Sequence, residues 1–347
     1  MQASIISGAE TAAGKHQDPQ QITPLTHAEA KVSATNKISR NKTWNAPPDS
    51  EPSSELIEIA GSEILARLLS RRGVTTPEQA IPFLDPAHYT PTSPMAFPDM
   101  PAAIVRISKA IALQEKITVY GDYDVDGVTA TAVALSVLRK LGANVDYYIP
   151  NRSTEGYGLN LKAVSVLASK HRTRLIISCD CGISNFAEIN LAKQLGVDTI
   201  IVDHHSLPDM LPPAVAILHP KQFSENHPLF HLPGVGVAYK LCEALLLDNG
   251  MHDEVAKLHD FVTLGMIADM VPLVAENRYL VQVGLPALAK SPRAGIRALL
   301  EQTVKTDGTD MVGFSIAPRI NAVGRLSDAN LAVKLMTTDD EIEAGDL

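Results

Sequence analysis

The chain of 347 residues is poor in cysteine, with only Cys179, Cys181 and Cys242. An odd number of cysteines without a C-x-x-C pair argues against a disulfide framework and against a thiolate zinc site. We interpret Cys179 and Cys181 as small apolar residues of a buried strand. The sequence has no run of about 18 apolar residues, and Met1 is not followed by a basic region and an apolar run. We therefore expect a cytoplasmic protein without a membrane span.

Net positive charge and aromatic side chains are also scarce. Lysine and arginine number 30 against 39 aspartates and glutamates, which gives a formal net charge of −9, and one tryptophan accompanies seven phenylalanines. Proteins that coat nucleic acid with their whole surface are usually basic, so this balance argues against such a role. A nuclease remains compatible, because an acidic metal site lowers the net charge while a local basic groove can still hold phosphates. A composition with 45% hydrophobic and 20% charged residues is ordinary for a globular protein of two or three domains.

The hydrophobic pattern predicts an α/β fold. Residues 1–52 are rich in polar residues and proline, so we expect a disordered tail there. Residues 53–115 show helical periodicity, which predicts a helical N-terminal region. Over 116–272, short apolar runs alternate with helical patterns, which predicts a doubly wound, mainly parallel sheet. Residues 273–347 are expected to form a helical connector and the start of a C-terminal substrate-binding region.

The predicted strands of the sheet end close to polar residues. These strands cover residues 117–120, 145–149, 175–178 and 199–202. Sheets of this kind bind ligands at the carboxyl ends of their strands. Acidic residues or histidines follow three of the four strands, and they are the candidates for chemistry.

The first cluster is the segment 121–127, which carries Asp122, Asp124 and Asp126 on alternate residues after a strand. Three carboxylates so close together need cations or strong hydrogen bonds, because like charges repel at short range. An EF-hand loop counted from Asp122 would need a glutamate where this chain has Val133, so that interpretation fails. A solvated turn that caps the next helix remains an alternative for this cluster taken alone.

Three further segments add candidate ligands. Asp180 follows the third predicted strand, where a helix cap would be the more common explanation for a single aspartate. His204 and His205 follow the fourth strand, directly after Asp203, which can orient an imidazole through its second nitrogen. A pair of histidines is usually surface decoration, so the position after a strand carries the argument. Asp269 ends an apolar helix, where a carboxylate should be paired or should bind metal.

Together these segments bring carboxylates and one imidazole to a single strand-end rim, and the predicted ligands are Asp124, Asp126, Asp180, His204 and Asp269. Such a ligand set suits Mn²⁺ or Mg²⁺. Two such ions a few ångström apart can hold a phosphate and lower the pKa of a bound water, which then attacks in line. The sequence contains neither a Walker loop nor a Ser-His-Asp arrangement to compete for this chemistry.

In their order along the chain, these clusters resemble the four motifs of the DHH phosphoesterase superfamily, and within it those of the single-stranded-DNA exonucleases. The resemblance runs from about residue 55 to about residue 340. The supporting segments are VYGDYDVDG (119–127), PNRSTEGYGL (150–159), LPGVGV (232–237) and APRINAVGRL (317–326). So many motifs in the same order make a chance match remote.

The resemblance implies a role for each candidate residue and two bound ions. Asp180 and Asp269 would each contact both ions, Asp124 would serve one ion, and Asp126 and His204 would serve the other. This assignment predicts that removal of Asp180 abolishes hydrolysis without unfolding the protein, since that carboxylate would hold both ions.

Catalytic and substrate-binding roles follow from the same resemblance. His205 would contact the scissile phosphate or assist the leaving oxygen, with Asp203 orienting it, and Asp122 would be a ligand or a neighbour of the ligands. The residues that resemble a strand-binding motif are Arg319, Asn321 and Arg325. We expect them on a polar loop, where they would contact phosphates of the DNA.

The implied function is metal-dependent 5′→3′ exonuclease cleavage of single-stranded DNA in DNA repair and recombination, with a single-stranded-DNA-binding protein and helicases as candidate partners. Tyr120 stands where many superfamily members have a histidine. No DHH-associated domain or oligonucleotide-binding fold is recognised before Leu347, so we expect a C-terminally truncated chain that binds DNA weakly and with strong salt dependence. The alternatives are a DHH-type phosphatase or short-oligonucleotide hydrolase, and an inactive truncated DNA-binding protein.

Overall fold

The structure is a computed structural model that describes residues 51–303, 308–326 and 328–347. The chain divides into two units, residues 1–48 and 49–347, and every described residue lies in the second. The predicted tail therefore lies almost entirely outside the described residues, and the division of the remainder into three domains stays a prediction. None of the helices in the described part of the chain combines the length and the hydropathy that a membrane span needs.

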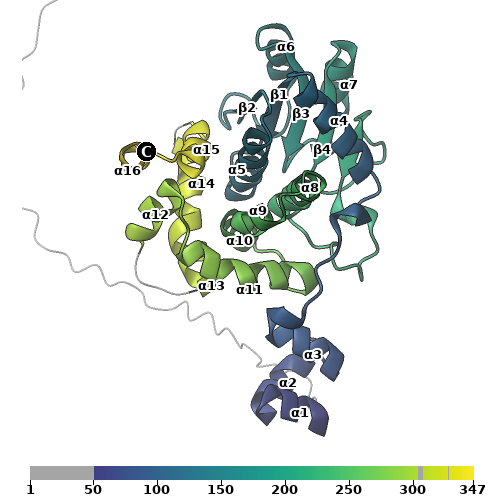
Figure 1. Cartoon of the computed structure of the whole chain (residues 1–347), viewed down its shortest axis with the longest axis vertical. Helices are drawn as coiled ribbons and strands as arrows, with labels where there is room; N and C mark the ends of the chain where they lie inside the picture. Colours follow the sequence, from purple (N-terminus) through teal and green to yellow (C-terminus); the bar gives the residue numbers. More distant parts are fainter. Residues whose placement is uncertain (1–50, 304–307, 327) are drawn as a thin grey trace, which may run out of the picture. The chain divides into compact units, whose positions relative to one another are not determined.

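A five-stranded parallel sheet lies in the upper part of the molecule as drawn in Figure 1. Its strands are β1 Lys116–Gly121, β2 Val145–Tyr148, β3 Thr173–Cys179, β4 Asp198–Val202 and β5 Ala216–Leu218. The order is β2-β1-β3-β4-β5, and all neighbours pair in parallel. The predicted α/β doubly wound fold is confirmed. The strand order reverses between β1 and β3, and in such sheets ligands bind where the order reverses.

Helices cover both faces of the sheet (Figure 1). The helices on one face are α4 Met100–Ala112, α5 Val125–Lys140 and α8 Gly234–Asp248, and those on the other are α6 Leu161–Ser169 and α7 Phe186–Gln194. Along β3, Leu175 and Ile177 pack into the first layer, and Ile176 packs into the second. This alternation follows from the two-residue period of a strand. Because both faces are buried, the strands appear in the sequence as nearly continuous apolar runs.

The helices before the sheet differ in one respect from the pattern expected from the sequence. Besides α4, they are α1 Ser54–Ala60, α2 Glu63–Arg71 and α3 Pro77–Leu84, with short 3₁₀ turns at Pro86–His88 and Pro94–Ala96. The apolar periodicity of residues 56–69 suggests one continuous helix, but Gly61 has a φ of 71° and ends α1. Glycine adopts this left-handed conformation without steric cost, so it stops the helix at that point.

The chain after α8 is entirely helical apart from short connections, within the residues described. Its helices are α9 His252–Val255, α10 His259–Ala268, α11 Ala275–Ala289, α12 Ala294–Glu301, α13 Gly308–Met311, the π-helix η5 Val312–Ile316, α14 Ala317–Leu326, α15 Asn330–Thr337 and α16 Glu341–Asp346. The expected polar loop around Arg319 is therefore wrong, because this segment is α14. Its buried residues Ala317, Ile320 and Gly324 recur at helical spacing, which explains why the segment folds as a helix.

Two asparagines attach the C-terminal helices to the end of β2 and to the start of α5. Asn330 accepts a hydrogen bond from Ile149 N at 3.1 Å and donates one to Ile149 O at 3.3 Å, so its amide continues the hydrogen bonding at the end of β2. Asn321 on α14 accepts one from Val125 N at 3.2 Å. This second contact places α14 beside the first turn of α5, where the acidic cluster lies.

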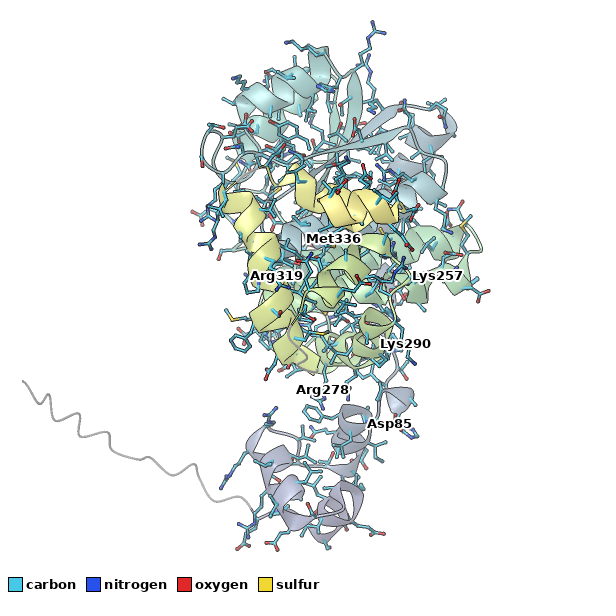
Figure 2. All side chains as sticks on the ribbon, turned by 90° about the vertical axis from the view of Figure 1, so that its left-hand side faces the viewer. Asp85, Lys257, Arg278, Lys290, Arg319 and Met336 are labelled. Carbon is cyan, nitrogen blue, oxygen red and sulfur yellow. The ribbon has the colours of Figure 1, made fainter. Side chains whose placement is uncertain are left out.

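The segment before α4 is attached to α8 and α11 through charged and polar side chains. Lys240 on α8 is fully buried, and its Nζ donates to Thr92 O at 2.7 Å and lies 2.7 Å from Oε1 of the fully buried Glu276. Arg278 on α11 donates to Phe83 O at 2.7 Å, and its guanidinium lies 3.6 Å from the Phe83 ring centroid. In Figure 2, Arg278 accordingly points toward the segment that contains Asp85.

Candidate metal centre

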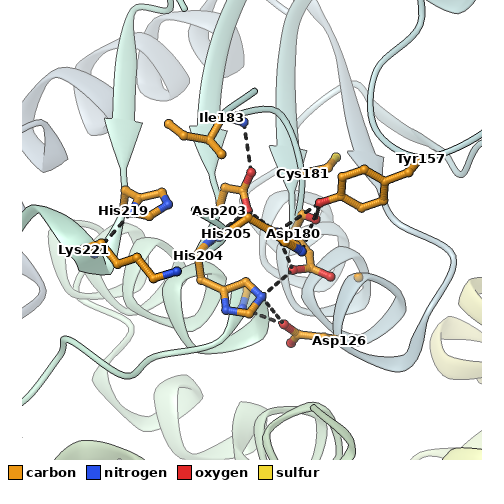
Figure 3. Close-up of polar contacts among 12 residues, drawn as sticks. Asp126, Tyr157, Asp180, Cys181, Ile183, Asp203, His204, His205, His219 and Lys221 are labelled. Carbon is orange, nitrogen blue, oxygen red and sulfur yellow. Dashed lines mark hydrogen bonds and ion pairs between the residues drawn. The ribbon is translucent and has the colours of Figure 1, made fainter. Parts of the chain in front are cut away.

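The candidate residues come from the carboxyl ends of β1, β3 and β4, around the point where the strand order reverses. Figure 3 shows Asp126, Asp180 and the two histidines together there. The loop after β1 supplies Asp122, Asp124 and Asp126, although Asp126 already lies in the first turn of α5. The connections after β3 and β4 supply Asp180 and the Asp203–His205 segment. Asp269 comes from the C-terminal end of α10, a helix that packs against α5.

Asp180 is buried at the centre of this rim, with 1% of its surface exposed. Its φ of 62° is left-handed, a conformation that aspartate tolerates better than most residues. Its backbone N–H donates to Val202 O at 2.8 Å, which joins the end of β3 to the end of β4. Its Oδ1 accepts no hydrogen bond but lies 3.1 Å from Nε2 of His204.

Asp126 is held by the N-terminus of α8. Its two carboxylate oxygens accept hydrogen bonds from Gly234 N at 2.7 Å and Val235 N at 2.8 Å. The free amides and the dipole at a helix N-terminus favour a negative group at this position. A Cβ added at Gly234 would lie 2.6 Å from the side chain of Asp180, so only glycine lets α8 approach both carboxylates this closely.

The sequence does not predict the part that Gly234 and Val235 play in this site. The available signal was the proline and glycine in the segment 232–237, which place a helix start after Pro233. That signal predicts the helix, but it does not predict which carboxylate the helix will face.

The other aspartates of the first cluster have different surroundings. Asp124 is the N-cap of α5 and accepts a hydrogen bond from Gly127 N at 3.0 Å, so the helix-cap interpretation applies to this residue in addition to any role with metal. Asp122 is 2% exposed, and its Oδ1 has no hydrogen-bond partner. A buried carboxylate oxygen without a partner is costly, which indicates that a cation belongs beside it.

Asp203 organises the two histidines through several hydrogen bonds. Its Oδ1 accepts from His204 N at 2.7 Å and lies 2.7 Å from Nδ1 of His205, and its Oδ2 accepts from Ile183 N at 2.9 Å. Both oxygens thus accept hydrogen bonds, through which Asp203 orients the two histidines. His204 points the other way, with its Nε2 near Asp180, Asp126 and Asp269.

A tyrosine that the sequence argument did not single out also reaches the site. The hydroxyl of Tyr157 donates to Asp180 O at 3.1 Å and lies 3.0 Å from Nδ1 of His205 (Figure 3). Its segment, 150–159, is part of the resemblance, but spacing alone could not show that the loop after β2 crosses to the end of β3. Tyr120, in contrast, turns away from the rim into the second layer, where its hydroxyl donates to Gly158 O at 3.1 Å.

The electrostatics of the carboxylates are those of a site that lacks positive charge. Burial, followed by the charge of Asp124, raises the pKa of Asp122 to about 7 and that of Asp269 to about 6. Burial also raises the pKa of Asp126 and of Asp180 well above the usual range, and neighbouring aspartates raise both further. A bound cation would reverse these shifts by favouring the ionised carboxylates.

The two histidines are shifted in opposite directions. Burial, together with the nearby His205, lowers the pKa of His204 to about 4, so its imidazole is neutral at pH 7 and has a free lone pair for a metal. The hydrogen bond to Asp203 raises the pKa of His205. Burial alone would raise the pKa of Asp203, but the hydrogen bond and charge of His205 outweigh it, and the net shift is downward.

Within the described part of the chain, three groups of side chains can present ligand atoms within 4.8 Å of one another. These groups are Asp122–Asp124–Asp180, Asp126–His204–Asp269 and Asp180–His204–His205. The structure thus brings all five predicted metal ligands together, with Asp122 among them. Asp180 belongs to two of the three groups. Oxygen-rich sets with one imidazole fit Mn²⁺ or Mg²⁺ better than a soft metal.

The three residues of the expected strand-binding motif do not all lie on the same face of α14. Asn321 lies at the rim, and Arg325 follows it by four residues, which places both on the same face of α14. Arg319 precedes Asn321 by two residues and donates to Gln302 O at 2.7 Å, away from that face. Figure 2 shows Arg319 on the C-terminal helices, at a level between Met336 and Arg278.

Comparison with known proteins adds three findings. Residues 116–266 match the model of the DHH family, N-terminal domain. The single-stranded-DNA-specific exonuclease RecJ of Bacillus subtilis is 42% identical over 304 residues, which are 86% of this chain and 38% of that protein. The chain thus spans less than half the length of this relative.

Solved structures of RecJ proteins are similar to the present fold and contain metal. Exonuclease RecJ bound to manganese matches with a TM-score of 0.69 at 36% identity, over 74% of this chain and 65% of that one. RecJ from Thermus thermophilus in complex with Mg²⁺ matches with a TM-score of 0.59 at 30% identity, over 80% of this chain and 36% of that one.

Proposed function

The chain belongs to the DHH family and is similar to RecJ proteins, and from this premise we propose that its acidic site cleaves phosphodiester bonds of single-stranded DNA in the 5′→3′ direction. The proposal includes two divalent ions, Mn²⁺ or Mg²⁺, bound at the carboxyl ends of β1, β3 and β4. The substrate comes from the relatives, whose names describe a single-stranded-DNA-specific exonuclease, and the direction of cleavage comes from the family resemblance.

The observation that carries the proposal is the set of buried carboxylates without a lysine or arginine partner. Asp122, Asp126 and Asp180 are each at most 2% exposed, and no lysine or arginine forms an ion pair with any of them within the described residues. Burying such charges costs several kcal/mol each unless a cation or hydrogen bonds compensate. A surface turn or a helix cap needs only one carboxylate, so neither explains why three of them are buried together.

Two ions, not one, are supported by the grouping of the ligands. Asp122–Asp124–Asp180 and Asp126–His204–Asp269 share no residue, yet Asp180 of the first lies 3.1 Å from His204 of the second. Held by these residues, divalent ions would supply Lewis-acid chemistry to a phosphate and would lower the pKa of a water molecule. Asp180 lies where it could contact both ions, as the family resemblance implies.

The chain's own residues would hold the phosphate and control protons. We assign His205 to the scissile phosphate, because Asp203 occupies its Nδ1 and 42% of its side chain is exposed at the rim. With Nδ1–H directed to Asp203, Nε2 is the nitrogen that can donate to a phosphate oxygen or pass a proton to the leaving oxygen. Asn321 and Arg325 on α14 would bind the next phosphate along the strand, and Arg319 would act only if it releases Gln302 O.

The test is degradation of labelled DNA by the purified chain. A single-stranded oligonucleotide carries the label at its 5′ end in one sample and at its 3′ end in the other, and the same sequence is also tested as a duplex. We expect Mn²⁺-dependent release of the 5′ label first, little cleavage of the duplex and none with a chelator. Asp146→Asn is the matched control, because Asp146 lies on β2, exposed and paired with Lys116.

The other candidate functions predict different results in the same assay. Hydrolysis limited to dinucleotides or to a phosphomonoester would replace this proposal with a phosphatase or short-oligonucleotide hydrolase. Binding of DNA without Mn²⁺-dependent cleavage would indicate an inactive DNA-binding protein. Titration with Mn²⁺ then gives the number of ions, for which we expect two.

A further inference from the structure

Tyr157 lies on a loop that connects β2 to α6 and crosses over the end of β3. It is flanked by Gly156 and Gly158, with φ values of 81° and 76°, which other residues rarely adopt. Glu155 fixes the base of the loop, accepting hydrogen bonds from Tyr148 Oη at 2.6 Å and from Asn151 N at 2.8 Å. The tyrosine is therefore presented to the site by an ordered loop.

The hydroxyl of Tyr157 joins two different parts of the site. It donates its single proton to the backbone carbonyl of Asp180 at 3.1 Å. Its oxygen lies 3.0 Å from Nδ1 and 3.2 Å from Nε2 of His205, so it faces the edge of the imidazole. The two rings meet edge to face, with centroids 5.3 Å apart.

These contacts do not resemble ordinary packing of a surface tyrosine. Tyr157 is 47% exposed and contributes little to the apolar layers, yet its one polar atom is directed at the two motif residues. Asp203 contacts the same imidazole from its Nδ1 side at 2.7 Å. Nδ1 of His205 thus lies between a carboxylate oxygen at 2.7 Å and a hydroxyl oxygen at 3.0 Å.

We propose that Tyr157 is a positioning residue, whose hydroxyl couples the ring of His205 to the main chain of Asp180. This inference rests on the proposed function, because it assumes that His205 contacts the substrate phosphate. The hydroxyl keeps the imidazole at a fixed distance from the Asp180 carboxylate, so the group that contacts the phosphate and the group that binds metal move together. Tyr157 is not a member of the candidate ligand groups.

The test is the substitution Tyr157→Phe, which removes the hydroxyl and keeps the ring. We expect kcat on single-stranded DNA to fall roughly 10- to 100-fold, the range typical for groups that orient residues of a metal site, with KM and Mn²⁺ affinity nearly unchanged. Tyr147→Phe is the matched control, because Tyr147 also donates to a main-chain carbonyl, that of Asn330 at 3.2 Å, and lies outside the site. The control should leave kcat unchanged.

A spectroscopic measurement separates this inference from the proposed function. In metal-free protein with ¹³C-labelled histidine, the Cε1–H peak of His205, assigned with His205→Gln, should be single and sharp. Tyr157→Phe should broaden or split that peak, and Tyr147→Phe should not. An unchanged peak with unchanged kcat would overturn the inference, as would a loss of Mn²⁺ affinity as large as the loss of kcat. If the parent chain cleaves no DNA, the proposed function fails, but the peak still decides whether Tyr157 positions His205.

Discussion

Asp180 and Glu276 are both almost completely buried, but their surroundings differ. Glu276 lies 2.7 Å from the ammonium of Lys240 and accepts hydrogen bonds from Tyr89 Oη and Thr92 N, both at 3.0 Å. Asp180 has other carboxylates as neighbours, and their charges raise its pKa further. The first carboxylate is compensated by the protein, whereas the second is not.

This difference separates a structural charge from a functional one. A buried ion pair such as Lys240–Glu276 joins segments far apart in the sequence. Removal of one partner leaves the charge of the other buried without compensation. In the cluster around Asp180, burial and neighbouring carboxylates raise the pKa values of the members and so favour their protonated forms. Substitutions in the two regions should therefore have opposite effects on stability and activity.

The largest effect on activity is expected from Asp180→Asn. Asparagine tolerates the left-handed φ of Asp180, so the fold should persist, while the charge for both ions is lost. We expect Mn²⁺-dependent hydrolysis to fall by roughly a thousandfold or more, since metal ions contribute several kcal/mol to phosphate chemistry. The metal-free free energy of unfolding should be unchanged or higher, because repulsion among the carboxylates decreases. Activity equal to that of the parent, or a strongly destabilised variant, would contradict the assignment.

Lys240→Met should have the opposite effects, with a loss of stability and no loss of activity. Removal of the ammonium leaves Glu276 buried without a cation, so we expect the free energy of unfolding to fall by about 3–5 kcal/mol. Activity per folded molecule should stay unchanged, because Lys240 lies outside the metal centre. Adding Glu276→Gln, which keeps an acceptor for Tyr89 and Thr92, should restore most of the loss. Chemical denaturation of the two variants measures this, and no recovery in the double variant would show that Glu276 is not the source of the loss.

A smaller effect is expected from Gly234→Ala, which tests how α8 holds the centre together. The new Cβ would lie 2.6 Å from the side chain of Asp180, so Asp180 or the helix must shift. We expect Mn²⁺ affinity to fall roughly 10- to 100-fold, with little loss of stability. Gly236→Ala is the control, because its Cβ would meet the flexible ends of Leu232 and Met266. Calorimetric titration with Mn²⁺ compares the two, and equal affinities would mean that α8 does not position the ligands.

The sheet and the acidic centre could be predicted from the sequence for a local reason. Four strands are continuous apolar runs between helical patterns, and the residues directly after a parallel strand must lie at the same edge of the sheet. Asp122, Asp180 and His204 could therefore be placed together without knowledge of the tertiary structure. β5 could not be predicted, because it has only three residues and no helix separates it from β4.

The remaining features depend on contacts between distant segments. The amides of Gly234 and Val235 bind Asp126 across more than 100 residues of sequence, and Tyr157 reaches His205 from a loop that belongs to another strand. α14 was expected as a loop because Arg319, Asn321 and Arg325 dominate its sequence. Its few buried residues pack against α5 and α15, which only the tertiary structure shows.

The most direct test of an uncompensated centre is the free energy of unfolding as a function of pH, with and without Mn²⁺. The folded pKa values of Asp122, about 7, and Asp269, about 6, lie above the value of about 3.9 for an unfolded aspartate, so the folded chain binds more protons between these limits. Without metal, the stabilisation from these two groups is fully present below about pH 4 and is lost as the pH rises through 6 and 7. The free energy of unfolding should fall by up to about 1.4 kcal/mol per pH unit for each group. With excess Mn²⁺, ionised carboxylates are needed, so stability should rise over the same pH range. Parallel curves with and without Mn²⁺ would contradict the account.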